Sequence, residues 1–205
     1  MPAILAKKLG MTQRFGEDGR VERVTVLEAG PCPVLAIRTE DADGYEAVQL
    51  GFGAVREKAL TRAELGHLKK ADASAHRHVV EFRDEVGELL VGETVTVDSF
   101  EVGQRVKVSG RSKGKGFQGT IKRHRFNRGP AGHGSHNIRA PGSIGASATP
   151  SRVFKGIRGP GRMGGGRITQ RGLTVVEIMP AKNLLLVRGA VPGPTGATVE
   201  VRSDG

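Results

Sequence analysis

A glycine-rich hexapeptide is the first candidate for chemistry in this sequence. Residues 114–119 read Gly-Lys-Gly-Phe-Gln-Gly, which matches the G-x-G-x-x-G pattern of dinucleotide-binding loops. In such folds an acidic residue about 20 positions downstream binds the ribose, whereas the next acidic residue here is Glu177. An enzyme that binds an anionic nucleotide stays open as an alternative. The composition fits better with backbone amides that approach phosphates beside Lys113 and Lys115.

Three histidines and a serine could in principle support metal binding or hydrolysis. Zinc takes about four ligands, and neither Cys, Asp nor Glu accompanies His124, His133 and His136. Ser135 has no acidic residue nearby in sequence to orient a histidine base, and the Gly-x-Ser-x-Gly elbow is absent. We therefore expect no catalytic residue, no metal and no cofactor. Histidines in such surroundings stack on bases or bond phosphates.

The middle third of the chain carries the positive charge. Between Val102 and Val176 there are sixteen Lys and Arg residues and neither Asp nor Glu. The rest of the chain has a net charge of −5, so the formal charge of +11 is concentrated in this segment. Like charges on a flexible segment repel one another until a polyanion neutralises them. Nucleic acid is the polyanion that the charge predicts.

The cations alternate with Gly and Pro and not with apolar residues, which excludes a membrane-surface helix. Aromatic residues make up 4% of the chain, and Trp is absent, which is little for a platform that stacks single strands. Structured RNA fits best, while a DNA-bending protein stays open as an alternative. The predicted RNA contacts are Arg111, Lys113, Lys115, Lys122, Arg123, Arg125, Arg128, His133, His136, Arg139, Ser143, Arg152, Lys155, Arg158, Arg162 and Arg167.

The elements that must position this segment are mostly strands. Apolar runs of strand length are found at residues 3–9, 21–28, 34–38, 47–52, 95–100, 105–109, 173–179, 184–187 and 197–202. The capping-box spacing of Thr61 and Glu64 predicts a helix, and residues 117–125 could form a second, short one. From residue 126 to residue 170 neither a helical nor a strand period is present.

A mainly β chain with a closed barrel follows from this pattern. The C-terminal strands need partners, because a hairpin alone is marginally stable in water. We expect them to close the sheet begun by the N-terminal half, which makes residues 1–108 and 172–205 one discontinuous barrel domain. A helical insertion at about residues 61–73 and an irregular basic extension over residues 109–171 complete the expected organisation.

The single cysteine and the N-terminus bear on the compartment. Cys32 has no partner for an intramolecular disulfide, and we expect it to be a small buried side chain at the start of a strand. The apolar run within residues 1–11 is too short for a signal peptide or a membrane span. A soluble, cytoplasmic protein is the expectation.

Motifs along nearly the whole chain resemble the bacterial form of universal large-subunit ribosomal protein three. They include Leu9-Gly10-Met11-Thr12, Ala29-Gly30-Pro31-Cys32-Pro33-Val34, Ser112-Lys113-Gly114-Lys115-Gly116-Phe117, Pro141-Gly142-Ser143-Ile144-Gly145 and Val153-Phe154-Lys155-Gly156. The resemblance implies a barrel of the translation-protein type, and a long loop that runs through large-subunit ribosomal RNA toward the peptidyl transferase centre. It also implies a role in subunit assembly in the cytoplasmic ribosome. The implied partners are that RNA and neighbouring large-subunit proteins, without a membrane or a small-molecule substrate.

Overall fold

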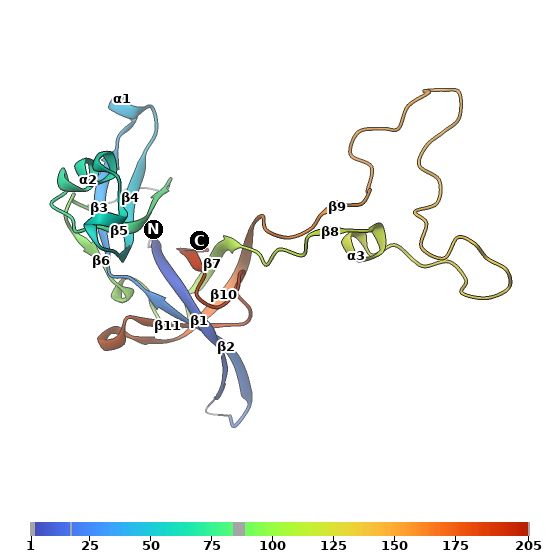
Figure 1. The fold of residues 1–205 in the computed structure, drawn as a ribbon. Coiled ribbons are helices and arrows are strands. Elements are labelled where there is room, and N and C mark those ends of the chain that lie inside the picture. Colours follow the sequence, from blue (N-terminus) through green and yellow to red (C-terminus); the bar gives the residue numbers. More distant parts are fainter. Residues whose placement is uncertain (1–2, 17, 84–88, 205) are drawn as a thin grey trace. The chain divides into compact units, whose positions relative to one another are not determined.

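The computed structural model describes residues 3–16, 18–83 and 89–204. Contacts between Cα atoms divide the chain into two units (Figure 1). Unit 1 comprises Met1–Ser112 and Arg167–Gly205, and unit 2 comprises Lys113–Gly166. Residues 1–2, 17, 84–88 and 205, which belong to the expected barrel domain, lie outside the described residues.

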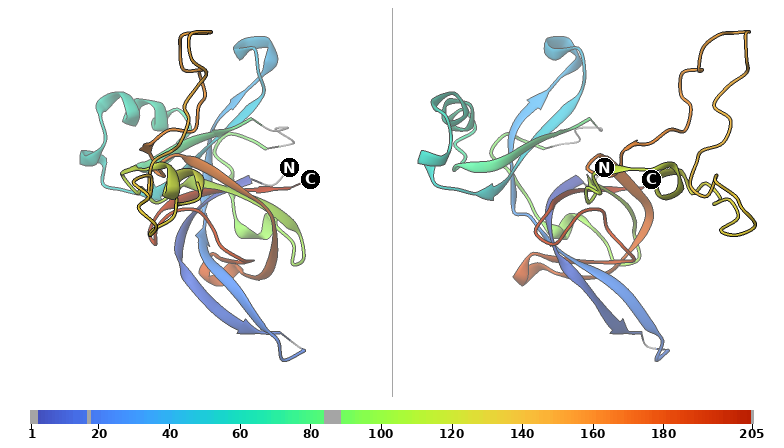
Figure 2. Two further views of the ribbon diagram at one scale, coloured as in Figure 1. Left: turned by 90° about the vertical axis from the view of Figure 1, so that its right-hand side faces the viewer. Right: turned by 45° about the vertical axis from the view of Figure 1, so that its right-hand side comes forward.

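Six of the described strands close an antiparallel barrel in unit 1, and Figure 2 shows it from two further directions. Their order is β1 (Ala3–Phe15), β12 (Thr198–Ser203), β7 (Arg105–Arg111), β10 (Arg167–Met179), β11 (Leu184–Arg188) and β2 (Val21–Ala29). Ala3 pairs with Arg202 and Leu185 pairs with Leu27, so strands from both ends of the chain close the sheet. The mainly β fold with a closed barrel is confirmed. Closure leaves the C-terminal strands without an exposed edge.

Not every expected strand joins the barrel. A separate sheet has the order β5 (His76–Phe82), β4 (Ala47–Ala54), β3 (Cys32–Arg38) and β6 (Thr94–Val95). The strand expected at residues 95–100 is wrong beyond Val95, because Val97–Ser99 forms a 3-10 turn, η2. Strand β5 was not expected, since its His76, Arg77 and His78 interrupt the apolar pattern.

One hydrophobic core joins the barrel to the separate sheet. Leu27, Val108 and Leu185 of the barrel are fully buried, and they belong to the same cluster as Leu50 and Phe82 of the sheet. Apolar area that leaves water contributes about 25 cal/mol per Å². The two sheets of unit 1 are therefore expected to unfold together.

The connections of the separate sheet carry short helices. Helix α1 (Glu40–Asp43) follows β3, while the 3-10 turn η1 (Glu57–Ala59) and helix α2 (Arg62–Lys69) lie between β4 and β5. The capping box of α2 is confirmed: the Glu64 amide donates to Thr61 Oγ1 (3.3 Å) and the Thr61 amide donates to Glu64 Oε2 (2.7 Å). Leu68 is 2% exposed, which anchors this helix.

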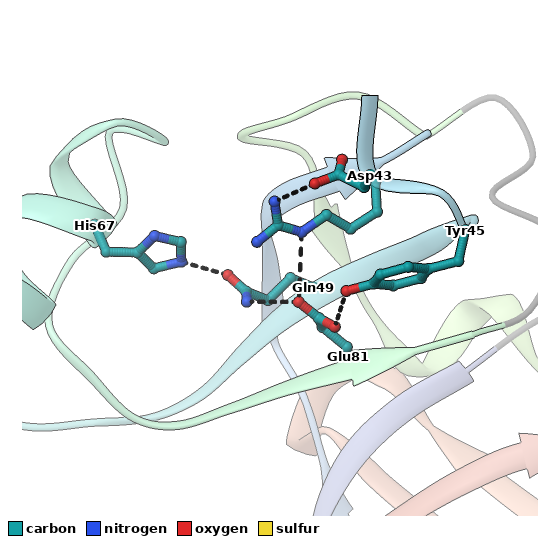
Figure 3. Close-up of polar contacts among 6 residues, drawn as sticks. Asp43, Tyr45, Gln49, His67 and Glu81 are labelled. Carbon is teal, nitrogen blue, oxygen red and sulfur yellow. Dashed lines mark hydrogen bonds and ion pairs between the residues drawn. The ribbon is translucent and has the colours of Figure 1, made fainter. Parts of the chain in front are cut away.

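Polar side chains tie α2 to the sheet, as Figure 3 shows. The Glu81 carboxylate accepts hydrogen bonds from the Tyr45 hydroxyl (3.0 Å) and from Gln49 Nε2 (3.3 Å). Since the Gln49 amide nitrogen is used in this way, its oxygen accepts from Nε2 of His67 on α2. Glu81 also lies 3.5 Å from Arg38 Nε. This cluster has a structural role, because its hydrogen bonds and ion pair join β3, β4, β5 and α2 within unit 1.

The buried cysteine behaves as expected. Cys32 is the first residue of β3 and is fully buried, and burial raises the pKa of its thiol to about 12. A thiol with so high a pKa is protonated at neutral pH and is a poor nucleophile.

Unit 2 by itself has little regular structure. Strand β8 (Phe117–Gln118) pairs with β9 (Gly161–Arg162), and helix α3 (Thr120–His124) follows β8. The short helix expected at residues 117–125 therefore begins three residues later. All of residues 113–166 are described, and among them Thr120 alone is buried. Unit 2 has no hydrophobic core of its own.

The edges of the irregular segment differ from the expectation. Strand β7 continues to Arg111, and β10 begins at Arg167, which pairs with Arg111. Residues 167–170, which showed no strand period, are thus part of a strand, because barrel pairing supplies the hydrogen bonds that local pattern does not indicate.

Candidate nucleic-acid interface

The whole net charge of the chain lies in one of its two units. Unit 2 contains eleven Lys and Arg residues and neither Asp nor Glu, which gives it a formal charge of +11. Unit 1 contains 21 basic and 21 acidic residues and is formally neutral. A segment with this charge attracts polyanions.

All sixteen residues predicted to contact RNA are exposed. Fourteen of them lie in unit 2, while Arg111 and Arg167 lie opposite each other in unit 1. Arg167 forms an ion pair with Glu200 of β12, so its charge is compensated within the barrel. The nearby Arg171 is paired in the same way with Asp204 (2.9 Å). The hydrogen bond from Arg171 lowers the pKa of the Asp204 carboxyl.

The glycine-rich hexapeptide forms one side of a narrow stem. The Lys115 amide donates to the Met163 carbonyl and the Met163 amide donates to the Gly116 carbonyl, both at 2.9 Å. The glycine pattern had suggested that backbone amides here approach phosphates. The Lys115 amide instead donates its hydrogen bond inside unit 2. A Cβ at Gly164 would overlap the Lys113 carbonyl, so glycine is required where the two limbs meet. The side chains of Lys113 and Lys115 remain exposed.

Helix α3 holds the returning limb of the loop. Arg123 Nη1 donates to the Gly159 carbonyl (2.8 Å), and His124 Nε2 lies 3.0 Å from the same oxygen. His124 was noted in the sequence but was not among the predicted contacts. Sequence alone offers no signal for this contact, because it joins residues 35 and 36 positions apart.

Apolar side chains are exposed among the cations of unit 2. Phe117 is 77% exposed, Phe154 is 57% exposed and Ile144 is 54% exposed. The Arg152 guanidinium lies over the Phe154 ring, 5.3 Å from its centroid. Because unit 2 has no hydrophobic core, these side chains face solvent in the free protein. Flat guanidinium and aromatic groups also offer faces on which bases stack.

The described part of the chain shows no group of three or more His, Cys, Asp or Glu side chains that could hold a metal ion. None of the helices among these residues combines the length and the apolar character needed to span a bilayer.

Comparison with known proteins gives consistent matches. Residues 78–183 match the family Ribosomal protein L3. The chain is 52% identical over 200 residues to the large ribosomal subunit protein uL3 of Acaryochloris marina, which covers 97% of this chain and 94% of that protein. Identity to the uL3 proteins of Prochlorococcus marinus and Gloeobacter violaceus is 50% over 202 residues and 56% over 200 residues, covering 98% and 97% of this chain and 93% of each relative. With half or more of its residues identical over nearly its full length, the chain belongs to the ribosomal protein L3 (uL3) family.

Proposed function

We propose that this protein is a structural constituent of the large ribosomal subunit that binds large-subunit ribosomal RNA through unit 2. The observation that carries the proposal is the division of charge, which leaves unit 1 neutral and gives unit 2 the whole +11. Phosphates of neighbouring RNA segments repel one another, and cations on a thin chain fit between them where a globular domain would not. The fourteen exposed residues of unit 2 predicted from the sequence are the proposed contacts.

Unit 1 then anchors the protein beside neighbouring large-subunit proteins. The loop leaves β7 and returns to β10 at paired residues, Arg111 and Arg167. If fully extended, an out-and-back path of about 27 residues each way reaches at most about 97 Å. This length suits a loop that enters the subunit. The protein would thus support subunit assembly in cytoplasmic ribosomes.

A nucleotide-binding enzyme is the alternative with less support. The relatives are named as ribosomal proteins and not as enzymes. The hexapeptide that suggested a dinucleotide site is engaged by Met163. The chain therefore has no catalytic role in this proposal.

Salt dependence tests the proposed mode of RNA binding. If six to ten phosphate contacts form, the affinity for in vitro transcribed large-subunit RNA falls by roughly 10³ to 10⁵ between about 50 and 200 mM salt. Filter binding at constant magnesium measures the slope, and duplex DNA serves as competitor. A nearly flat titration would rule out recognition through phosphates. Equal competition by duplex DNA would favour the DNA-bending alternative.

The loop tip, residues 133–149, is proposed to reach toward the peptidyl transferase centre, as the family resemblance implies. This stretch carries one Lys or Arg, Arg139, and small side chains such as Ser143, whose hydroxyl donates to the Gly145 carbonyl (3.3 Å). Few charges and small side chains suit a crowded site where backbone packs against RNA.

Substitution of Ser143 by Trp tests this placement. Overpacking of a dense site costs about 1–3 kcal/mol, so Ser143→Trp is expected to slow growth and subunit assembly in cells that carry only the variant. It should also change susceptibility to antibiotics that bind the peptidyl transferase centre. Ser74→Trp in unit 1, at another exposed serine, is the matched control. Wild-type behaviour of Ser143→Trp in all three assays would refute a tight site around the tip.

A further inference from the structure

A groove in unit 1 lies where the separate sheet meets the barrel. Strands β4 and β5 line one side of it, and β1 and the start of β12 line the other. The polar side chains on its lining are Lys7, Arg77, His78 and Thr198. Among the residues that the structure describes, no acidic side chain lines this groove. The groove is therefore a positive site within a unit that is neutral as a whole.

Among the described residues, the two cations of this groove take no part in the ion pairs of unit 1. Some arginines of the barrel are paired with carboxylates, such as Arg14 with Glu177 (3.2 Å) and Arg188 with Glu22 (3.8 Å). Lys7 and Arg77 are exposed, and neither forms an ion pair with any described residue. Glu28 is the register partner of Lys7 on β2, yet the two side chains are not paired. Their charge is thus available to a ligand.

A second groove of unit 1 gives a direct comparison. It is lined by Arg83, Arg167 and Arg202 but also by Glu81 and Glu200. The two carboxylates in its wall offset two of the three arginine charges and repel an anion. The groove with Lys7 and Arg77 is lined by two cations and no carboxylate, whereas the second groove has three arginines and two carboxylates.

His78 is placed to contribute a hydrogen bond. Burial and, to a smaller extent, the charge of Arg77 lower the pKa of His78 below its usual value, so the ring is neutral at pH 7. A neutral imidazole has one N–H that can donate to an anionic oxygen. Phe52 is the register partner of His78, and a Cβ at the neighbouring Gly53 would approach the His78 ring to 3.6 Å. That distance is an ordinary van der Waals contact, and the φ of +75° is what favours glycine at this position.

We propose that this groove binds the phosphodiester backbone of RNA, as a contact of unit 1 that is separate from the contacts of unit 2. The inference rests on the proposed function, because unit 2 would hold the barrel beside the RNA. Once the chain is tethered in this way, the second contact forms at a high effective concentration. Two cations and one imidazole are then sufficient, although they would bind a free anion weakly. A groove lined by positive charge attracts the phosphates of a nucleic acid, whereas an acidic groove of the same size would repel them.

The test compares three full-length proteins on in vitro transcribed large-subunit RNA: the wild type, the groove variant Lys7→Gln with Arg77→Gln, and the control Lys69→Gln with Lys70→Gln. The control removes the same charge from two exposed lysines at the end of α2. Each lost phosphate contact lowers the slope of log affinity against log salt by about 1. The groove variant should therefore lower the slope by about 2, while the control keeps the wild-type slope. Thermal unfolding checks that all three proteins fold.

The outcomes separate this inference from the proposed function. A steep wild-type slope that the groove variant leaves unchanged refutes the groove contact and leaves the function of unit 2 intact. A flat wild-type slope refutes the proposed function, and the groove inference with it.

NMR of the His78 ring in the wild type supplies a readout without substitutions. We expect its signals to shift on addition of an RNA fragment at phosphate concentrations where inorganic phosphate has no effect. An equal response to both would show a general anion site and would overturn the assignment to RNA backbone.

Discussion

Replacement of residues 113–166 by a short Gly/Ser linker is expected to abolish tight binding to large-subunit RNA while the barrel stays folded. The main hydrophobic cluster contains no residue of unit 2, so the removal of unit 2 takes away no core contact. Arg111 and Arg167 are paired, which places the two ends of a linker side by side. Loop-closure cost changes by only about 0.6 kcal/mol for each doubling of loop length. Loss of all eleven cations should weaken RNA binding by on the order of 10³-fold or more.

Thermal unfolding measures whether the barrel stays folded, and filter binding measures the affinity for RNA. A matched control keeps the length of unit 2 and replaces its eleven Lys and Arg residues by Gln. This control separates the effect of charge from the effect of removing the segment. If both variants lose RNA affinity and keep a cooperative transition, charge is the cause. Loss of the cooperative transition in the linker variant would show that unit 2 contributes to the core of unit 1. Wild-type affinity in the linker variant would place RNA binding elsewhere.

Truncation of Leu185 is expected to cause the largest loss of stability from a single substitution considered for this protein. Leu185 lies in β11, is fully buried, and pairs with the fully buried Leu27 of β2 and with Ile178 of β10. It therefore joins the C-terminal strands to the N-terminal half of the barrel. Leu185→Ala removes these contacts and leaves a cavity, which lowers the free energy of unfolding by about 2–5 kcal/mol. Urea denaturation measures the change from the shift of the midpoint.

Leu90→Ala is the control for this measurement. Leu90 is 71% exposed, so its truncation should change stability by less than about 0.5 kcal/mol. A loss below about 1 kcal/mol for Leu185→Ala would indicate that the core around β11 relaxes to fill the space, or that the barrel is open at this point. A similar loss for both variants would show that denatured-state effects and not burial determine the result.

The sequence by itself determined the features that depend on residue type and local spacing. Alternating apolar residues predicted the strand at 21–28, because burial on one face of a sheet imposes a period of two. A short continuous apolar run predicted the strand at 184–187. The capping box at Thr61 was visible for the same reason, since its hydrogen bonds join residues three positions apart. Charge adds residue by residue, so the position of the basic segment could be read directly. The motifs for family membership were also readable in order along the chain.

Only the tertiary structure decided which strands share a sheet and which cations are free. An apolar run has the same pattern in a barrel and in a second sheet packed on it, so the separate sheet with Leu50 could not be predicted. Strand β5 was hidden by its histidines, and its pairing with β4 joins residues far apart in sequence, such as His78 and Phe52. The ion pair of Arg167 with Glu200, 33 positions away, could not be predicted from the sequence. Lys7 and Arg77 lie in separate strands, and only the packing of two sheets brings them to one groove. The reason is physical: a charge is a property of one residue, whereas its compensation depends on neighbours that the fold brings together.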